Sequence, residues 1–190
     1  MINKELKEIT KLAENKEEFR KRFIEVNQLN KINSNKKERE KFLSSVYMII
    51  KNELGEVLLQ RRKGTNLWSG FLALPAGHID KGEDAYEALI REAKEELGIH
   101  IKVEDIENVF VVNRKNESLE PYFDIYFEIN KYEGLIEIKE PDKCSELIWI
   151  HPNEFPNDMI EFEKEAIKKN ERGIKFSTIF VEKEKMLIKK

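Results

Sequence analysis

The stretch Gly77–Ile99, GHIDKGEDAYEALIREAKEELGI, decides how the rest of the chain is interpreted. Apolar residues recur every fourth position in its second half, which predicts an amphipathic helix with one apolar face. They are Ala85, Leu89, Ala93 and Leu97, with Ile90 beside them. Asp84 stands just before this run and is expected to cap the helix, because a carboxylate there can accept the free N–H groups of the first turn.

Three glutamates of this helix are expected to project from neighbouring positions on another face. Glu92, Glu95 and Glu96 stand at i, i+3 and i+4, and like charges at this spacing destabilise an exposed helix by roughly 0.2–0.5 kcal/mol per pair. A bound cation would compensate them. Crowded oxygen ligands suit Mg²⁺ or Mn²⁺, which would in turn hold a substrate phosphate. The alternative is a solvated helix face, which is common in glutamate-rich chains.

The glutamates belong to a longer pattern. Gly77, Glu83 and the run Arg91-Glu92-Ala93-x-Glu95-Glu96-x-Gly98-Ile99 stand at fixed spacings. On this pattern the chain resembles the Nudix hydrolases of the MutT-like type, which cleave a nucleoside diphosphate linked to another moiety. The resemblance covers roughly residues 43–180, including QRRKGTNLWSGFLALPAGH and EPDKCSELIWIHPNEFPN. Ala76 is a departure, since many relatives carry a second glycine there.

The resemblance implies a metal-dependent hydrolysis in which water attacks phosphorus in line. It assigns Mg²⁺, which Mn²⁺ could replace, to Glu92, Glu95 and Glu96, with the carbonyl of Gly77 assisting. Two further roles are implied by the same resemblance. Arg91 and Glu83 form a bridging pair that orients the ligands, and Glu140 in IKEPDKC matches a position of a further acidic metal ligand.

The substrate-binding side has weaker signals in the sequence. Strand alternation would put Arg61 and Arg62 on opposite sheet faces, so that one could pair with a substrate phosphate; surface charge is the alternative for either. Four further residues could stack on or hydrogen-bond a nucleobase, although each could instead belong to the core or a turn. They are Tyr47, Phe123, Phe155 and Asn157.

The substrate class is open at this stage. Family members that hydrolyse ADP-ribose tend to carry a proline about fifteen residues after the motif, where this chain has Asn113-Arg114. This favours a (deoxy)nucleoside triphosphate, with ADP-ribose, nucleotide sugars and dinucleotides as alternatives. A Nudix-fold ligand sensor without turnover is a second functional class, but the complete set of glutamates argues for an enzyme.

Composition excludes several other classes. The chain has 190 residues with 40% hydrophobic content, enough for one domain with a real core and an extension. Its net charge of −3 gives no general signature of nucleic-acid binding. Cys144 is the single cysteine, so no disulfide framework exists and a cytoplasmic location is expected. No apolar run predicts a membrane span.

The chain is expected to have three parts. Residues 1–42 read as amphipathic helices that cannot bury their apolar stripe alone, so they should dock on the domain or on a second copy, giving a possible homodimer. Alternatively, their basic residues could help to grip a polyanionic substrate. Residues 43–180 form the Nudix domain, and residues 181–190 form a charged tail.

Within the domain, the pattern predicts strands and a second helix. Residues 43–51 and 56–62 should form a hairpin. Further strands are expected at 106–113, 122–130, 135–139 and 146–150, and residues 174–180 should form either a last short strand or a docked tail. Asn157 or Asp158 should cap a helix that runs to about residue 170 and ends at Gly173. This mixed order fits an α/β fold, and the resemblance specifies an α/β/α sandwich with a mixed sheet.

Overall fold

The computed structural model describes residues 18, 21, 39–116 and 120–181. It divides the chain into two units, Met1–Glu40 and Lys41–Lys190. The predicted helical extension at 1–42 lies almost wholly outside the described residues, as does the predicted charged tail. The fold described below is therefore that of the second unit.

Two sheets organise this unit. The larger sheet has the strand order β4-β1-β6-β5-β8, and the smaller has the order β3-β2-β7. The larger one is mixed, because β1 runs parallel to β6 and β5 parallel to β8, while its other pairs are antiparallel. The strands are β1 (Leu43–Ile50), β2 (Val57–Arg62), β3 (Leu72–Ala73), β4 (Ala76–His78), β5 (Ile106–Asn116), β6 (Tyr122–Ile129), β7 (Cys144–Ile150) and β8 (Phe176–Val181).

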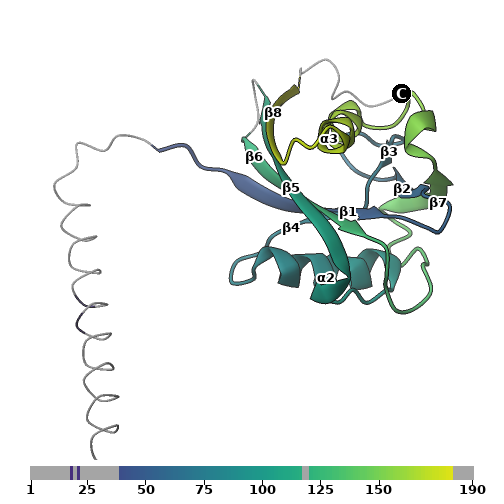
Figure 1. Ribbon diagram of the computed structural model, residues 1–190, viewed down its shortest axis with the longest axis horizontal. Coiled ribbons are helices and arrows are strands. Elements are labelled where there is room, and N and C mark those ends of the chain that lie inside the picture. Colours follow the sequence, from purple (N-terminus) through teal and green to yellow (C-terminus); the bar gives the residue numbers. More distant parts are fainter. Residues whose placement is uncertain (1–17, 19–20, 22–38, 117–119, 182–190) are drawn as a thin grey trace, which may run out of the picture. The chain divides into compact units, whose positions relative to one another are not determined.

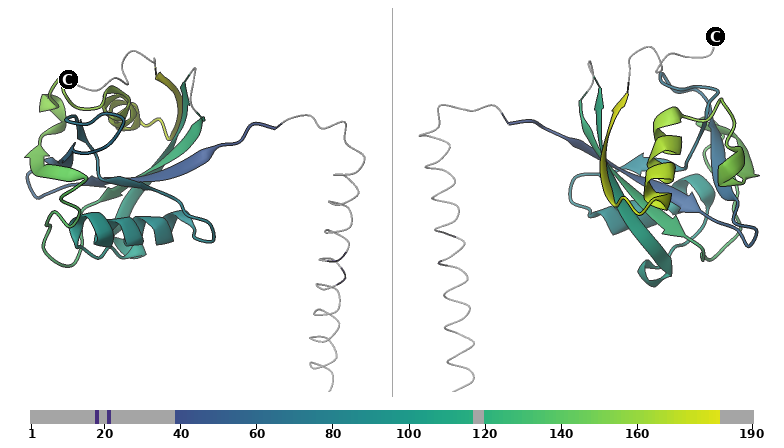
Figure 2. Two further views of the ribbon diagram at one scale, coloured as in Figure 1. Left: turned by 180° about the vertical axis from the view of Figure 1, so that it is seen from behind. Right: turned by 45° about the horizontal axis from the view of Figure 1, so that its top comes forward.

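Two α-helices cover opposite faces of the larger sheet, α2 (Ala85–Leu97) and α3 (Glu161–Glu171); both are seen in Figures 1 and 2. Alternation along β1 explains the arrangement, since successive side chains of a strand point to opposite faces. Val46 and Met48 pack in the core with α2, whereas Tyr47 and Ile49 pack in the core with α3. The predicted α/β/α sandwich with a mixed sheet is confirmed for the described domain. Short 3₁₀ helices occupy Val103–Asp105 and Pro152–Glu154.

Helix α2 is specified locally at both ends. Asp84 accepts the N–H groups of Tyr86 and Glu87, and the Glu87 side chain accepts the N–H of Asp84, which completes a capping box. Gly98 ends the helix in the left-handed region at φ 73°, where a side chain would be strained. The predicted cap of this helix is confirmed.

The predicted hairpin of residues 43–51 and 56–62 is wrong. Both strands form, but β1 pairs with β4 and β6, and β2 pairs with β3 and β7. An isolated bridge between Lys51 and Val57 takes the place of the expected ladder. The chain does reverse at Asn52–Gly55. Because β1 and β2 each have two other partners, this turn connects a strand of the larger sheet to a strand of the smaller one.

Two further predictions are corrected. Residues 135–139 form no strand; their N–H groups at Glu137 and Lys139 bond instead to the last carbonyls of α2, at Leu97 and Glu96. Helix α3 begins after Ile160 without a side-chain cap. Neither predicted cap residue lies next to the helix start, and the carboxylate of Asp158 bonds to Arg61 instead.

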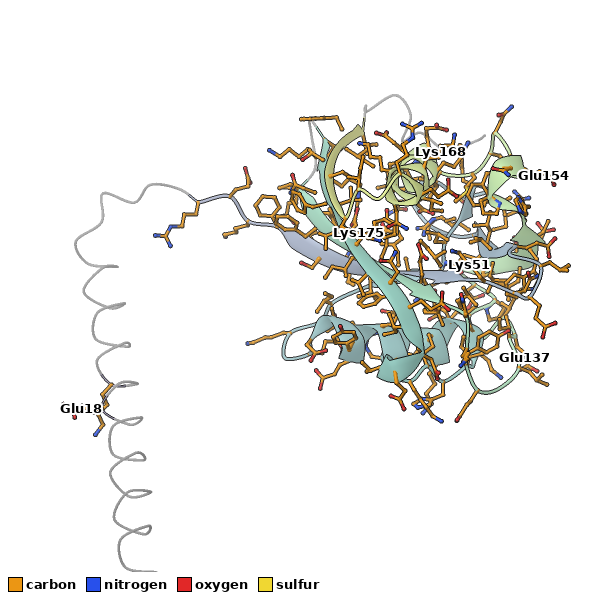
Figure 3. The ribbon with its side chains drawn as sticks, viewed as in Figure 1. Glu18, Lys51, Glu137, Glu154, Lys168 and Lys175 are labelled. Carbon is orange, nitrogen blue, oxygen red and sulfur yellow. The ribbon has the colours of Figure 1, made fainter. Side chains whose placement is uncertain are left out.

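Charged side chains such as Glu137 and Lys168 are exposed on the outside of the domain (Figure 3). Among the described residues, no helix is both long and apolar enough to cross a bilayer.

Candidate active site

Two glutamates of α2, Glu92 and Glu96, lie against the short strand β4, which carries Gly77. A Cβ atom placed on Gly77 would lie 1.9 Å from Cδ and 2.0 Å from Oε1 of Glu92. The backbone of β4 therefore approaches the Glu92 carboxylate more closely than any other residue type would allow. Pairing of β4 with β1 through Val46–Gly77 holds this approach in place.

Arg91 lies at the centre of an ion-pair network. Its guanidinium contacts Glu83 (2.6 Å), Glu92 (2.7 Å) and Glu95 (3.2 Å), and it also donates to the carbonyl of His78 (2.9 Å). The bond from Arg91, assisted by the Asp80 N–H, lowers the pKa of Glu83 to about 2. Arg91 thus ties the loop before α2 to two of its glutamates.

Glu96 is held by hydrogen bonds from strands of both sheets. Its Oε2 accepts the N–H of Ala76 at 3.1 Å, and Gln60 from β2 also bonds to it. Burial raises the pKa of Glu96 to about 8, with further contributions from the negative charges of Glu92 and Glu140. The fold therefore brings the carboxylates of Glu92, Glu96 and Glu140 near one another. Glu140 is distant from the helix in sequence and pairs with Lys143 (2.8 Å).

These residues fit a hard divalent cation by their donor chemistry. Besides burial, mutual repulsion raises the pKa of Glu96. The side-chain donors are all oxygen, and the Gly77 backbone lies directly against the Glu92 side chain. Among the residues that the structure describes, no group of acidic, histidine or cysteine side chains is already gathered for chelation. Arg91 engages Glu92 and Glu95 instead, so a cation would compete with its guanidinium.

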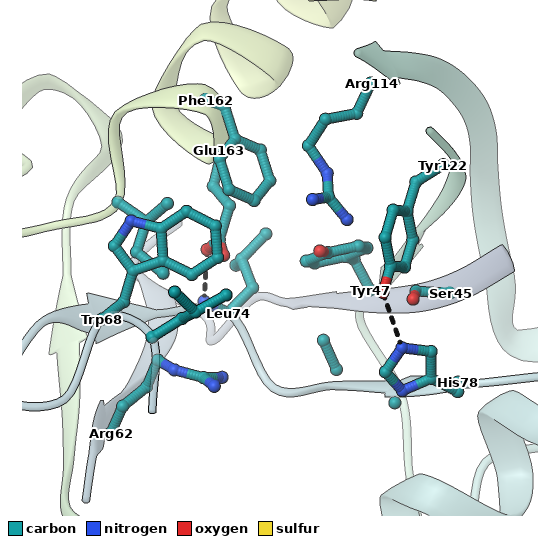
Figure 4. A pocket seen from close by; sticks show the side chains of 14 residues that line it. Ser45, Tyr47, Arg62, Trp68, Leu74, His78, Arg114, Tyr122, Phe162 and Glu163 are labelled. Carbon is teal, nitrogen blue, oxygen red and sulfur yellow. Dashed lines mark hydrogen bonds between the residues drawn. The ribbon is translucent and has the colours of Figure 1, made fainter. Parts of the chain in front are cut away.

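A cavity of about 200 Å³ begins at Gly77 and His78 and extends between the two sheets toward α3 (Figure 4). Its remaining lining comes from both sheets, from the loop before β3 and from the start of α3. These residues are Ser45, Tyr47, Arg62, Leu67, Trp68, Leu74, Ala76, Arg114, Tyr122, Ile160, Phe162 and Glu163. The cavity is mixed in character, with aromatic rings and several charged groups.

One side of the cavity is held by a buried ion pair. Arg114 bonds to Asp124 through Nε (2.5 Å) and Nη2 (3.0 Å), and both side chains are almost fully buried. The guanidinium carbon lies 4.0 Å from the ring centre of Tyr122 and 4.8 Å from that of Phe162. Tyr122 in turn bonds to His78 at 3.1 Å, which links this wall to the residue after Gly77.

Of the residues predicted to bind substrate, the structure brings two into the cavity. Tyr47 and Arg62 line it, and Tyr47 stacks on Tyr126 with 4.6 Å between ring centres. Arg61 lies outside the lining, paired with Glu146 (2.7 Å) and Asp158 (3.1 Å). The other three also lie outside it: Phe123 packs on Phe42, Phe155 packs against the core and Asn157 is exposed in a turn.

Several cavity residues carried no usable signal in the sequence. Trp68 stood in a polar loop, Arg114 followed a strand-like run, and Glu163 looked like one more charge on a solvated helix. Gln60, which supports Glu96 and lies outside the cavity lining, was one polar residue in a strand. Their shared position depends on pairings between distant segments.

Comparison with known proteins identifies the family and the fold. The sequence model of the NUDIX domain family matches residues 41–170. The crystal structure of a MutT NUDIX hydrolase from Burkholderia pseudomallei is similar, with a TM-score of 0.59, 25% identity and coverage of 68% of this chain and 98% of that one. A MutT protein from Methanosarcina mazei has the same fold, with a TM-score of 0.62 at 22% identity, covering 72% of this chain and 97% of that one.

Curated relatives carry names of nucleotide hydrolases. A putative 8-oxo-dGTP diphosphatase of Bacillus subtilis is 26% identical over 132 residues, which are 70% of this chain and 82% of that protein. An RNA pyrophosphohydrolase of Psychrobacter cryohalolentis is 38% identical over 65 residues. That second match covers 34% of this chain and only 35% of the relative.

Proposed function

Because this chain belongs to the Nudix hydrolase family, we propose that it hydrolyses a nucleoside triphosphate to the monophosphate and pyrophosphate in a reaction that depends on Mg²⁺. The close approach of Gly77 to Glu92 carries the proposal. It sets the Glu92 carboxylate against the backbone at the mouth of a cavity that also starts at Gly77. Phosphates at the carboxylates and a nucleoside in the cavity would then belong to one molecule.

The proposed ligands of the cation are Glu92, Glu95 and Glu96, with the Gly77 carbonyl and Glu140 as further donors. When bound, the cation offsets negative charge on the phosphate oxygens and acts as a Lewis acid toward the phosphoryl group. The role of the protein is to fix the geometry of these ligands. Ala76 and Gln60 hold the Glu96 carboxylate by hydrogen bonds, and outer partners of this kind orient the ligands of a metal.

Arg91 and Glu83 act as the positioning pair in this proposal. Arg91 contacts Glu92 and Glu95 and is itself held by Glu83 and the His78 carbonyl. Its guanidinium fixes the orientation of the two glutamates that it contacts. The hydrogen bond from Arg91 is also the main cause of the strongly lowered pKa of Glu83.

A substrate panel with Mg²⁺ tests the proposal. Ribo- and deoxynucleoside triphosphates are compared with ADP-ribose, a nucleotide sugar, a dinucleotide and an RNA carrying a 5′-triphosphate, and products are separated by ion-exchange chromatography. We expect nucleoside monophosphate and pyrophosphate in equal amounts from at least one triphosphate. If only a substrate from another class is turned over, that class would replace the triphosphate as the proposed substrate. Nucleotide binding without any turnover would indicate a ligand sensor.

A further inference from the structure

Glu140 differs from the other proposed metal donors because it lies beside a turn and not on a helix or strand. Residues 141–143 form this turn before β7, and the Glu140 carbonyl accepts the N–H groups of Lys143 and Cys144, both at 3.0 Å. Donors on loops are placed less precisely than donors on helices and strands. The position of the Glu140 carboxylate therefore depends on what the turn packs against.

The chain that follows β2 contacts this turn at three successive residues. The N–H of Lys63 donates to the Lys143 carbonyl at 2.7 Å, and the Lys63 ammonium donates to the Pro141 carbonyl at 3.2 Å. Between them, the Gly64 backbone lies so close to Asp142 that a Cβ atom placed on Gly64 would be 2.7 Å from the Asp142 carbonyl oxygen. Two neighbouring residues thus support the whole turn.

Gly64 is the part of this support that a side chain would disrupt. Its φ is 65°, in the left-handed region that favours glycine. A Cβ atom essentially never comes within 3.0 Å of another heavy atom, and a backbone carbonyl cannot rotate away as the end of a flexible side chain can. Any larger residue at this position would therefore have to displace the turn itself.

A shift in strand register directly precedes this close approach. The pairing of β2 with β7 changes register between Arg61 and Arg62, so that Arg62 lies opposite Cys144, the residue that follows the turn. Irregularities of this kind bend a strand, and they are frequent next to active sites. Here the bend lies just before Lys63 and Gly64, at the point where the chain leaves β2 for the turn.

We propose that Gly64 is a positioning residue for the metal site, because its direct packing on the Asp142 carbonyl holds the Glu140 carboxylate beside the glutamates of α2. This inference rests on the proposed function and adds to it the residue that places the donor most distant in sequence. The negative charge of Glu140 already acts on Glu96. A displaced turn would carry the Glu140 carboxylate away from this neighbour.

The alternative is that Gly64 only completes a surface turn, and Gly55 provides the comparison. Gly55 has a φ of 75°, and a Cβ atom on it would meet no atom of the described residues within 4 Å. Alanine is strained by the backbone at both positions. Only at Gly64 would it also press on the turn beside Glu140, so the difference between the two variants isolates that contact.

Binding of Mn²⁺ alone measures the site without turnover. The full chain and its Gly64→Ala and Gly55→Ala variants are titrated with Mn²⁺, and the free ion is followed by electron paramagnetic resonance. Thermal melts show which variants are folded. We expect Gly64→Ala to weaken Mn²⁺ at least about tenfold, since loss of an outer support lowers metal affinity about 10- to 100-fold. Gly55→Ala should bind as the parent does, and equal affinities of the two variants would overturn the inference.

A double-mutant cycle shows whether Gly64 acts through Glu140. If it does, Gly64→Ala should add little to the loss of Mn²⁺ affinity caused by Glu140→Gln, because residues of one unit couple. Losses that add fully would show that Gly64 affects the site by another route, which would refute the positioning role.

A second variant keeps the test decisive if Gly64→Ala does not fold. Asparagine adopts the left-handed region more readily than alanine, yet Gly64→Asn still brings a Cβ atom against Asp142. It should also weaken Mn²⁺, with Gly55→Asn as its control, and unchanged affinity of Gly64→Asn would reject a role for the contact.

The positioning role and the proposed hydrolysis fail separately. If the expected losses of Mn²⁺ affinity occur but the parent turns over no triphosphate, only the hydrolysis is rejected. If the parent hydrolyses a triphosphate and Gly64→Ala keeps its Mn²⁺ affinity, only the positioning role is rejected. A parent that binds no Mn²⁺ would reject the metal site on which both depend.

Discussion

Replacing Gly77 by alanine tests whether the backbone of β4 sets the position of the Glu92 carboxylate. The new Cβ would lie 1.9 Å from Cδ and 2.4 Å from Cγ of Glu92. Ordinary carbon contacts are about 3.5–4.0 Å, so the side chain would have to move by roughly 1.5 Å or more. Gly77 has no positive φ, so the alanine itself fits the backbone without strain.

The expected effects on activity and stability differ sharply. A misplacement of about 1 Å at a reacting centre can lower the rate about 100-fold, which corresponds to about 2.7 kcal/mol of transition-state stabilisation. Stability should change far less. The alanine reduces the entropy of the unfolded chain, worth about 0.4–1 kcal/mol, while the displaced Glu92 loses its partly buried contact with Arg91, and the two effects oppose each other.

A double-mutant cycle with Glu92→Gln provides the assay. Steady-state kcat/KM is measured for Gly77→Ala, Glu92→Gln and the double variant, with thermal melts as a check on folding. If Gly77 acts through Glu92, the two losses should not add, because neighbouring residues in one unit couple. Additive losses, or full activity of Gly77→Ala with an unchanged melting temperature, would refute the reasoning.

The remaining predictions concern the carboxylates and the ends of the chain. Glu96→Gln should lower turnover by orders of magnitude while the fold persists, since it removes one ligand charge but keeps the shape; near wild-type turnover of the purified variant would exclude Glu96 as a ligand. Mg²⁺ or Mn²⁺ should support activity and Ca²⁺ should support it poorly, so full hydrolysis in excess chelator would contradict a metal-dependent reaction. The folded pKa of Glu163 is about 8, above the unfolded value of about 4.3. The folded state therefore binds the extra proton between these values, and its stability should fall as pH rises from about 4.3 to 8. In urea denaturation, the free energy of unfolding of Glu163→Gln should rise relative to that of the parent as the pH increases across that window. A difference between the two that does not change with pH would contradict this. Deleting residues 1–38 should leave turnover intact, because every proposed site residue lies downstream, and light scattering would show whether the oligomeric state changes.

The sequence by itself determined the features that depend on local spacing. Helix α2 follows from its apolar period, from the capping box of Asp84 and Glu87, and from Gly98 beyond its end. The neighbouring positions of Glu92, Glu95 and Glu96 follow from helix geometry alone. Most strands were predicted as well, since alternation and β-branched runs are signals that neighbouring residues carry. The family motif added the expected roles of these residues.

The tertiary structure alone decided which distant groups meet. Strand alternation predicted that Arg61 and Arg62 would separate, but only pairing of β2 with β3 and β7, with its register shift at these residues, showed that Arg62 enters the cavity. The hairpin was wrong because β1 and β2 each have two partners from elsewhere in the chain. Glu163 and Leu74 are 89 residues apart. Burial and long-range contact give such a residue its chemistry, and neither property is encoded in its immediate neighbours.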